Sequence, residues 1–169
     1  RVLLASRGGR VVQTAQDLKV QLQSMGTLAS VVATDSADAS EVNELLSASA
    51  ISAVFHAAGA DDAGLLIELA AHRVHWMYAS KSHGAWYLQC AAATASRETR
   101  LLFSSVGSGL SNVGQANYAA GTACLDAHAL SQRVRGTVAC SIQWPLVGGA
   151  GMGAAMFASM AERQVAIAG

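Results

Sequence analysis

Short apolar runs alternate along this chain with longer segments in which apolar residues recur at helical spacing. The runs are followed within a few residues by Gly, Ser, Asp or Pro, which is typical of buried strands that end in turns. The runs that predict strands span residues 2–5, 28–33, 51–55, 101–103 and 138–144. Because they read as nearly continuous apolar runs, we expect helices on both faces of the sheet that they form.

The segments between these runs predict helices with one apolar face. They span residues 11–25, 39–48, 64–95, 117–134 and 152–164. The long segment 64–95 predicts two helices that are broken near His75 and Trp76, whereas the Gly- and Ser-rich residues 107–116 predict a loop. A regular alternation of strand and helix favours βαβ units. The predicted fold class is therefore α/β, with a doubly wound parallel sheet in one domain.

Composition and charge narrow the class of protein. The 169 residues suit one domain, and 11 Lys and Arg balance 11 Asp and Glu, which excludes a generic basic nucleic-acid binder. With 52% hydrophobic residues the chain is not an acidic disordered tail, and no apolar run reaches the roughly 18 residues of a membrane helix. We therefore expect neither a nucleic acid nor a membrane as a partner, and no secretory signal.

The cysteines and histidines predict neither a disulfide framework nor a metal site. Cys90, Cys124 and Cys140 are odd in number and lack CxxC spacing, so we expect reduced, inert core thiols. This points to a reducing compartment, either the cytoplasm or an organellar stroma. No two of the five His are spaced i,i+4 on a helix, which argues against a metal centre.

In a doubly wound sheet, ligands bind where the strands end, so the residues just after each apolar run are the candidates for a site. Ser6 and Arg7 follow the first run; Arg7 can meet a ribose 2′-phosphate, or it is a surface Arg in a turn. Asp35 and Ser36 follow the second run; Asp35 can accept from an adenine amino group, or it caps the next helix. The small residues after the third run let a flat cofactor approach the backbone, or they form a tight turn. These small residues are Ala57, Ala58 and Gly59.

Three further residues make chemical sense together. Ser105 follows the fourth run, Tyr118 starts the next helix, and Lys81 lies on the preceding one. An ammonium group near a tyrosine favours the phenolate, so the hydroxyl can give a proton to a carbonyl oxygen as hydride arrives at the carbon. A serine hydroxyl can hold that same oxygen. The alternative is a solvent-facing Lys, a loop Ser and a Tyr at a helix start, each of which is common by itself.

At these residues the chain resembles the ketoreductase domains of modular polyketide synthases, which are extended relatives of the short-chain dehydrogenase/reductases. Animal-type fatty acid synthases carry a similar domain. The resemblance covers essentially the whole chain. It rests on Phe-Ser-Ser-Val at 103–106, Gly-Gln-Ala-Asn-Tyr-Ala-Ala at 114–120, His-Ala-Ala-Gly at 56–59, Lys-Ser-His-Gly-Ala-Trp at 81–86, Ser-Ile-Gln-Trp at 141–144 and Gly-Met at 151–152.

The resemblance implies a role for each matching position. Tyr118 would be the proton donor, Ser105 would orient the carbonyl, and Lys81 would tune Tyr118 and hold the nicotinamide ribose. Arg7 would face the 2′-phosphate of NADPH and Asp35 its adenine, while residues 57–59 would lie along the cofactor. Pro145, Leu146 and Val147 would lie near the nicotinamide amide, and the helix 152–164 would be a lid over the substrate cleft. The implied reaction reduces a β-ketoacyl thioester on an acyl carrier protein to the β-hydroxyacyl thioester, with other megasynthase domains as partners.

The chain also departs from the family pattern. The Gly-rich phosphate-binding turn is absent, because residues 1–169 match the family from its second strand onward, so the chain is expected to be an N-terminally incomplete catalytic subdomain. Thr122 stands where the family usually has Asn; it can bind a water in a proton relay but lacks the amide. Pro145 stands where a Gly is usual.

The two stereochemical fingerprints of the family are both incomplete. Asp61-Asp62-Ala63 matches a Leu-Asp-Asp motif without its last Asp, and Leu110 stands where the opposite class has Trp. Two other functions stay open beside the reductase. One is a catalytically inactive, structural reductase-like domain of a megasynthase. The other is a free-standing dehydrogenase that acts on a small alcohol.

Overall fold

The computed structural model describes residues 1–10, 12–13, 16–60, 62–92, 99–110, 113–145 and 147. Its strands are β1 (Val2–Ser6), β2 (Val12–Gln13), β3 (Gln16–Asp17), β4 (Ala29–Ala33), β5 (Ala53–His56), β6 (Thr99–Ser105) and β7 (Ala139–Trp144). Its α-helices are α1 (Leu18–Ser24), α2 (Ala39–Ser47), α3 (Ala71–Tyr78), α4 (Gly84–Ala92), α5 (Gly107–Leu110) and α6 (Ala116–Val134). A 3₁₀ turn, η1 (Leu66–Glu68), precedes α3, and a π-helical turn, η2 (Ala79–His83), joins α3 to α4.

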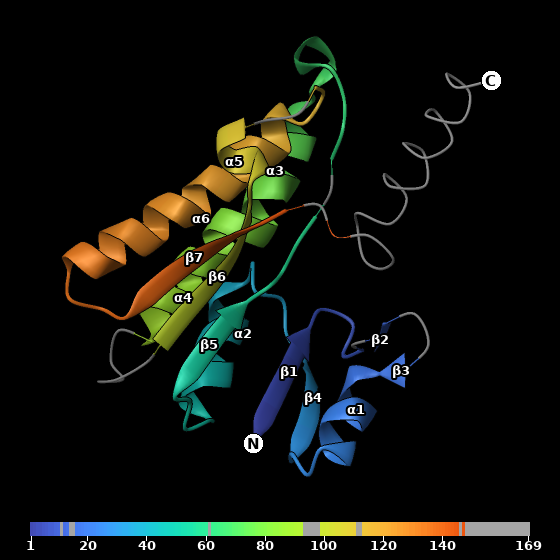
Figure 1. Ribbon diagram of the computed structural model, residues 1–169, viewed down its shortest axis with the longest axis vertical. Helices are drawn as coiled ribbons and strands as arrows, with labels where there is room; N and C mark the ends of the chain where they lie inside the picture. Colours follow the sequence, from blue (N-terminus) through green and yellow to red (C-terminus); the bar gives the residue numbers. More distant parts are fainter. Residues whose placement is uncertain are drawn as a thin grey trace.

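The main strands pair in parallel, as the alternation of strands and helices predicts. β1 pairs with β4, while β6 lies between β5 and β7 in a second sheet. The sequence predicts one sheet, but these strands form two parallel sheets. β1 and β5 are the edge strands at which the two sheets lie next to each other in Figure 1. Figure 1 also shows the chain leaving β1, β5 and β7 toward the same end of the molecule, so the strand ends of both sheets gather there.

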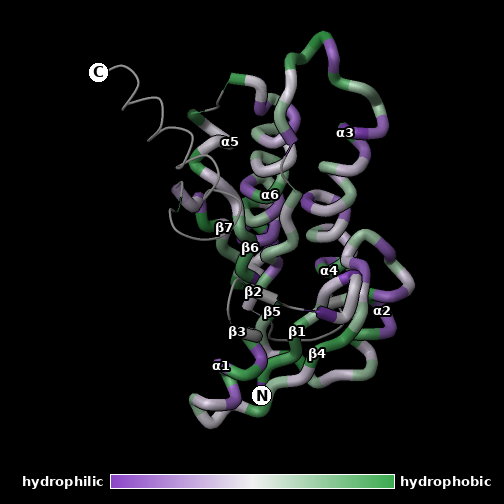
Figure 2. The backbone as a smooth tube through the Cα atoms, turned by 90° about the vertical axis from the view of Figure 1, so that its right-hand side faces the viewer, coloured by the Kyte–Doolittle hydropathy of each residue, from purple (hydrophilic) through white to green (hydrophobic). Residues whose placement is uncertain are grey.

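Helices pack on one face of the β5–β6–β7 sheet. Leu102 on β6 is buried with Ala85 of α4 and with Leu125 and Ala129 of α6, and these four residues form the apolar core cluster. The opposite face is open over the described residues: Phe55 is 64% exposed, and the rings of Phe103 and Trp144 stack there. For the β5–β6–β7 sheet, the described residues therefore place helices on one face only, whereas α1 packs against β4 of the other sheet, on the side opposite α2 (Figure 2). Figure 2 shows hydrophobic colouring along β1 and β4 as well, in line with the apolar runs of the sequence.

Several predicted element boundaries are wrong. The helix expected at 11–25 begins only at Leu18, because β2 and β3 form a short antiparallel pair before it. The chain stays helical through His75 and Trp76, and its irregularity is the π turn at 79–83. Gly107–Leu110 forms a helical turn inside the expected loop. The segment 152–164, Leu146 and Asp61 lie outside the described residues.

Two residue-level expectations are corrected as well. Asp38, not Asp35, caps α2, because its carboxylate accepts from the backbone N–H groups of Ser40 (2.8 Å) and Glu41 (3.2 Å). Two of the three cysteines are not core thiols: Cys90 and Cys140 are exposed, and Cys124 is half-buried. The cysteines are free. Among the described residues, no helix combines the length and the hydropathy that crossing a membrane requires.

Candidate active site

Lys81, Ser105 and Tyr118 converge where the strands end. Ser105 is the last residue of β6, Tyr118 lies in the first turn of α6, and Lys81 lies in the π turn. The Lys81 Nζ stands 4.7 Å from the centroid of the Tyr118 ring. Ser105 and Tyr118 both lie close to Gly107. A Cβ added at Gly107 would lie 3.3 Å from Ser105 Oγ and 3.8 Å from Tyr118 Cε1. The structure thus brings together three side chains from elements that are far apart in sequence.

The Lys81 side chain is buried on its way to this position. Lys81 is only 2% exposed, and its stem passes α6 at Gly121, where an added Cβ would lie 3.3 Å from Lys81 Cδ and 3.1 Å from Met77 Cγ. A side chain larger than hydrogen at this point would displace the stem. The ammonium group then meets the ring face of Tyr118, where the negative face of the ring attracts a cation.

Thr122 does not join this group. Its side chain is fully buried in α6, and its hydroxyl donates back to the carbonyl oxygens of Tyr118 (2.9 Å) and Ala119 (3.0 Å). Its own carbonyl accepts from the hydroxyl of Ser104 at 3.2 Å. The hydroxyl is thus engaged within its own helix, which leaves the predicted relay through Thr122 without geometric support.

The residues predicted to bind the cofactor follow the strand ends, as the topology requires. Arg7 is exposed just beyond β1, and the hydroxyl of Ser6 donates to the Arg10 carbonyl (2.8 Å) and accepts from the Arg10 N–H, closing the turn that begins there. Asp35 is half-buried beyond β4, and its carboxylate accepts from the Ala37 N–H at 2.9 Å. Ser36 is half-buried, with its Oγ 3.1 Å from the position of an added Cβ at Gly84.

The remaining cofactor candidates lie beyond β5 and β7. Ala57 and Gly59 are exposed after β5, and Ala58 between them is half-buried. Pro145 and Val147 are exposed after β7. These residues thus follow the ends of β5 and β7, and Figure 1 shows the chain leaving β1, β5 and β7 toward the same end of the molecule.

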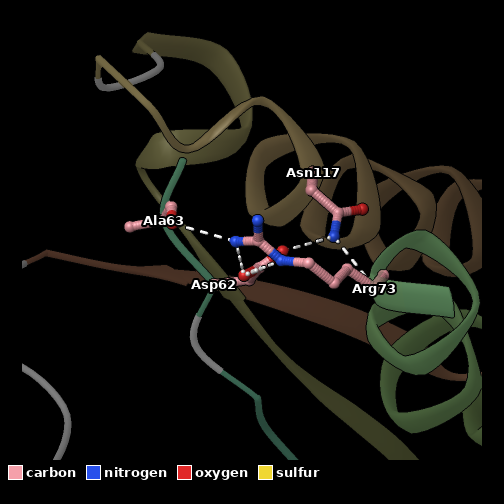
Figure 3. Close-up of polar contacts among 4 residues, drawn as sticks. All are labelled: Asp62, Ala63, Arg73 and Asn117. Atoms are coloured by element: carbon pink, nitrogen blue, oxygen red, sulfur yellow. Dashed lines mark hydrogen bonds and ion pairs between the residues drawn. The ribbon is translucent and has the colours of Figure 1, made fainter. Parts of the chain in front are cut away.

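An ionic network beside Tyr118 was not predicted as a unit. Arg73 on α3 donates from its Nε and Nη2 to the Asp62 carboxylate and from its Nη2 to the Ala63 carbonyl (2.9 Å), as Figure 3 shows. Asn117 donates from Nδ2 to Asp62 at 2.9 Å and to the Arg73 carbonyl at 3.1 Å. The hydrogen bonds from Arg73, and then from Asn117, hold the pKa of Asp62 below its usual range. The network ties the loop after β5 to the residue that precedes Tyr118.

A second polar cluster fixes the short helix that follows Ser105. The Asp126 carboxylate of α6 accepts from Ser108 Oγ (2.7 Å) on α5, and from Ser141 Oγ (2.6 Å) and Gln143 Nε2 (2.8 Å) on β7. Burial raises the pKa of Asp126, but hydrogen bonds, that from Ser141 first, outweigh it and leave the pKa below its usual value. The charged carboxylate therefore joins α5, α6 and β7 beside the site.

Residues 1–149 match the family model of the KR domain. The chain belongs to this ketoreductase family. Polyketide synthase GfsB of Streptomyces halstedii is 37% identical over 148 residues, which is 85% of this chain and 3% of that protein. The spectinabilin polyketide synthase system protein NorB of Streptomyces orinoci is 36% identical over 161 residues, which is 92% of this chain and 7% of that protein.

Solved structures agree with this family. PlmKR1, the ketoreductase from the first module of phoslactomycin biosynthesis in Streptomyces sp. HK803, superposes with a TM-score of 0.79 at 32% identity. The match covers 90% of this chain and 36% of that one. The predicted Rossmann-like α/β fold with parallel strands is thereby confirmed. This ketoreductase chain spans about a third of that solved chain and a few per cent of the curated relatives.

The contacts of four residues near the site were not predicted from the sequence. Asp62 and His56 stand in motifs of the family pattern, but their contacts depend on other elements. Asn117 lies within the Gly-Gln-Ala-Asn-Tyr string, where only the Tyr was singled out. Arg73 carried no signal, because a helical Arg is ordinarily a solvated side chain.

Proposed function

We propose that this chain carries the carbonyl-reducing centre of a ketoreductase that uses NADPH. The substrate would be a β-ketoacyl thioester on an acyl carrier protein, and the product the β-hydroxyacyl thioester within polyketide synthesis. The observation that carries the proposal is the meeting of Lys81, Ser105 and Tyr118 at the strand ends of a ketoreductase-family chain. Acid, oxyanion ligand and cation are the groups that carbonyl reduction needs.

When bound at the strand ends, NADPH would supply the hydride for the carbonyl carbon, and the residues of this chain would do the rest. The Tyr118 hydroxyl donates its proton to the carbonyl oxygen, which becomes the hydroxyl of the product. The Ser105 hydroxyl donates a hydrogen bond to the same oxygen while negative charge develops on it. The Lys81 ammonium, 4.7 Å from the ring centroid, stabilises the phenolate that Tyr118 leaves after the transfer.

The residues at the strand ends fit the adenosine half of NADPH. The Arg7 side chain is exposed beyond β1, so its guanidinium is accessible to a 2′-phosphate. One carboxylate oxygen of Asp35 accepts from the Ala37 N–H, and the other can accept from an amino group. Ala57 and Gly59 present little side chain at the end of β5, which suits the close approach of a flat group.

One observation favours a second function, that of a structural reductase-like domain without catalysis. The Thr122 hydroxyl, at the position where the family usually has Asn, is engaged inside α6 rather than turned to the site. Such a domain would keep the fold but would neither bind NADPH at submillimolar concentration nor consume it.

The test replaces Tyr118 in the longest natural polypeptide that contains this chain. We expect Tyr118→Phe to lower kcat for reduction of a β-ketoacyl thioester with NADPH by about 10²- to 10⁴-fold, the range for loss of a general acid. Tyr87→Phe on α4 is the matched control, since Tyr87 contacts His83 rather than the three converging side chains. Equal kcat for Tyr118→Phe and the parent would show that the assigned role is wrong. A parent that neither binds nor oxidises NADPH would support the structural domain instead.

A further inference from the structure

His56 is a buried polar side chain that the proposed mechanism does not use. It is the last residue of β5 and only 3% exposed. Its Nε2 lies 3.1 Å from the backbone carbonyl oxygen of Lys81, twenty-five residues further along the chain. A strand end is thereby joined directly to the helical turn that presents Lys81.

The contact fixes which form of the ring is present. A carbonyl oxygen only accepts, so His56 must carry its proton on Nε2. Burial is the largest cause that lowers the pKa of His56, and the charges of Lys81 and His128 lower it as well. Hydrogen bonds to the carbonyls of Lys81 and Ser80 raise it, and the net pKa is about 4. At neutral pH the ring is therefore uncharged and donates from Nε2 to Lys81.

The site of this contact is the one irregular turn in an otherwise continuous helical stretch. Residues 79–83 adopt the π form, in which one extra residue is accommodated and the regular hydrogen-bond ladder is interrupted. Such turns are rare, and they are frequent at functional sites. At the end of this turn, the Gly84 N–H donates to the carbonyl oxygens of Ala79 and Lys81. His56 supplies a donor to this turn at the carbonyl of Lys81.

The packing around the ring shows a fitted pocket rather than an incidental approach. At Gly84, the first residue after the π turn, an added Cβ would lie only 2.9 Å from His56 Cε1 and 3.1 Å from Ser36 Oγ. Only Gly leaves room for the ring here. In the same way, Gly121 on α6 leaves room for the Lys81 side chain on its way to Tyr118.

We propose that His56 is a positioning residue: its Nε2–H holds the Lys81 carbonyl, fixes the π turn, and so keeps the Lys81 ammonium over the Tyr118 ring. This inference deepens the proposed function and rests on it for the catalytic consequence. The geometric part, that His56 locks the turn 79–83, stands on the contacts alone.

Two substitutions separate the hydrogen bond from the filling of space. His56→Phe keeps a ring of similar shape but has no donor, whereas the amide of His56→Gln can place an N–H near the position of Nε2. In the longest natural polypeptide that contains this chain, we expect His56→Phe to lower kcat at least tenfold with little change in KM for the thioester. His56→Gln should recover kcat to within a few-fold of the parent. Misplacement of a reacting group by about 1 Å can cost 10²-fold, so the expected loss is measurable.

Hydrogen exchange read by mass spectrometry supplies a readout that does not depend on turnover. We expect the peptide that spans 79–84 to exchange faster in His56→Phe than in the parent or in His56→Gln, with β7 unchanged. Gly84→Ala, which pushes a methyl group against the ring, should loosen the same peptide, so the geometry is tested even if His56→Phe fails to fold.

The outcomes divide cleanly between the two proposals. Parent-like exchange at 79–84 in His56→Phe and Gly84→Ala would overturn the positioning role. If the parent is active, the role would also be overturned by a His56→Phe variant that exchanges faster at 79–84 but keeps the kcat of the parent. Equal loss of kcat in the Phe and Gln variants would also overturn it, since the donor would then be irrelevant. If the exchange changes as expected but the parent consumes no NADPH, the proposed function fails while the locking of the turn by His56 stands.

Discussion

At the scale of single residues, the site depends on where small side chains permit close packing. Gly107 lets Ser105 and Tyr118 share one edge of the site, and Gly121 lets the Lys81 stem pass α6. Neither position needs a special backbone angle; what each needs is space. These glycines therefore act through sterics, because an added methyl group would meet another side chain at 3.3 Å or less.

The stability of the folded chain is expected to depend on pH through His56. Its pKa is about 4 in the folded chain and about 6.5 when unfolded, so the unfolded state binds the proton more readily. The stability that the neutral ring provides is fully present above pH 6.5 and is lost as the pH falls through 4. A shift of this size corresponds to about 3 kcal/mol. The titrating or charged groups that bear on the ring are Lys81 of the π turn and His128 of α6.

The corresponding measurement is the free energy of unfolding by urea between pH 7 and pH 4, in the parent and in His56→Gln. We expect the parent to lose more stability than the variant over this interval, by about 3 kcal/mol at most. His72→Gln is the control, because His72 is an exposed side chain at the start of α3. Parallel curves for the parent and His56→Gln would contradict the buried neutral ring.

At the scale of elements, the site is held by ties between segments rather than by one helix. The Asp62–Arg73–Asn117 network joins the loop after β5 to α3 and α6 (Figure 3). A backbone bond from Gly64 N to Gly114 O (2.8 Å) joins the same loop to the turn that leads into α6. The loop beside Tyr118 is thus fixed at two points.

We expect Asp62→Asn to loosen this loop, because the neutral amide loses the charge-assisted bonds to Arg73. Hydrogen exchange in the peptide that spans 62–68 should become faster. The melting temperature should change little, since partly exposed ion pairs contribute little to global stability. Glu68→Gln in η1 is the matched control, because it removes an acidic charge from the same segment without touching the network. If the two variants exchange alike, the network does not hold the loop.

Some of these elements follow from the sequence, and the reasons are physical. The apolar runs locate β1, β4, β5, β6 and β7 because nearly continuous apolar runs are typical of parallel strands. The residues after them reach one end of the fold because parallel strands finish together. Lys81, Ser105 and Tyr118 could thus be singled out before their distances were known. The π turn could not, because a single inserted residue barely disturbs a helical period.

Other features needed the third dimension. The segment before α1 contains Val12, a β-branched residue type that suits a strand even though its spacing also suits a helix. Asp38 outcompetes Asp35 as the cap of α2 because its carboxylate, one residue before the helix, reaches two free N–H groups. Arg73 meets Asp62 only because α3 packs beside the loop after β5, which no local pattern records.

At the scale of the whole molecule, the described chain is two parallel sheets with their strand ends at one end, and helices on one face of the larger sheet (Figure 1). Equal numbers of acidic and basic residues give no broad field to attract a charged partner, so the proposed binding of NADPH would depend on local cations such as Arg7. The face of the β5–β6–β7 sheet that carries Phe55, Phe103 and Trp144 is open over the described residues. The catalytic assignment is independent of that face, because it rests on the strand ends.

The measurement that tests the central claim most directly follows the hydride itself. The longest natural polypeptide that contains this chain is incubated with a β-ketoacyl thioester and NADPH deuterated at C4, and the product is analysed by mass spectrometry. We predict one deuterium on the β-carbon that now bears the hydroxyl, formed by the parent and by Tyr87→Phe and strongly diminished in Tyr118→Phe. A folded parent that yields no deuterated β-hydroxyacyl product with deuterium on either face of C4 would contradict the account.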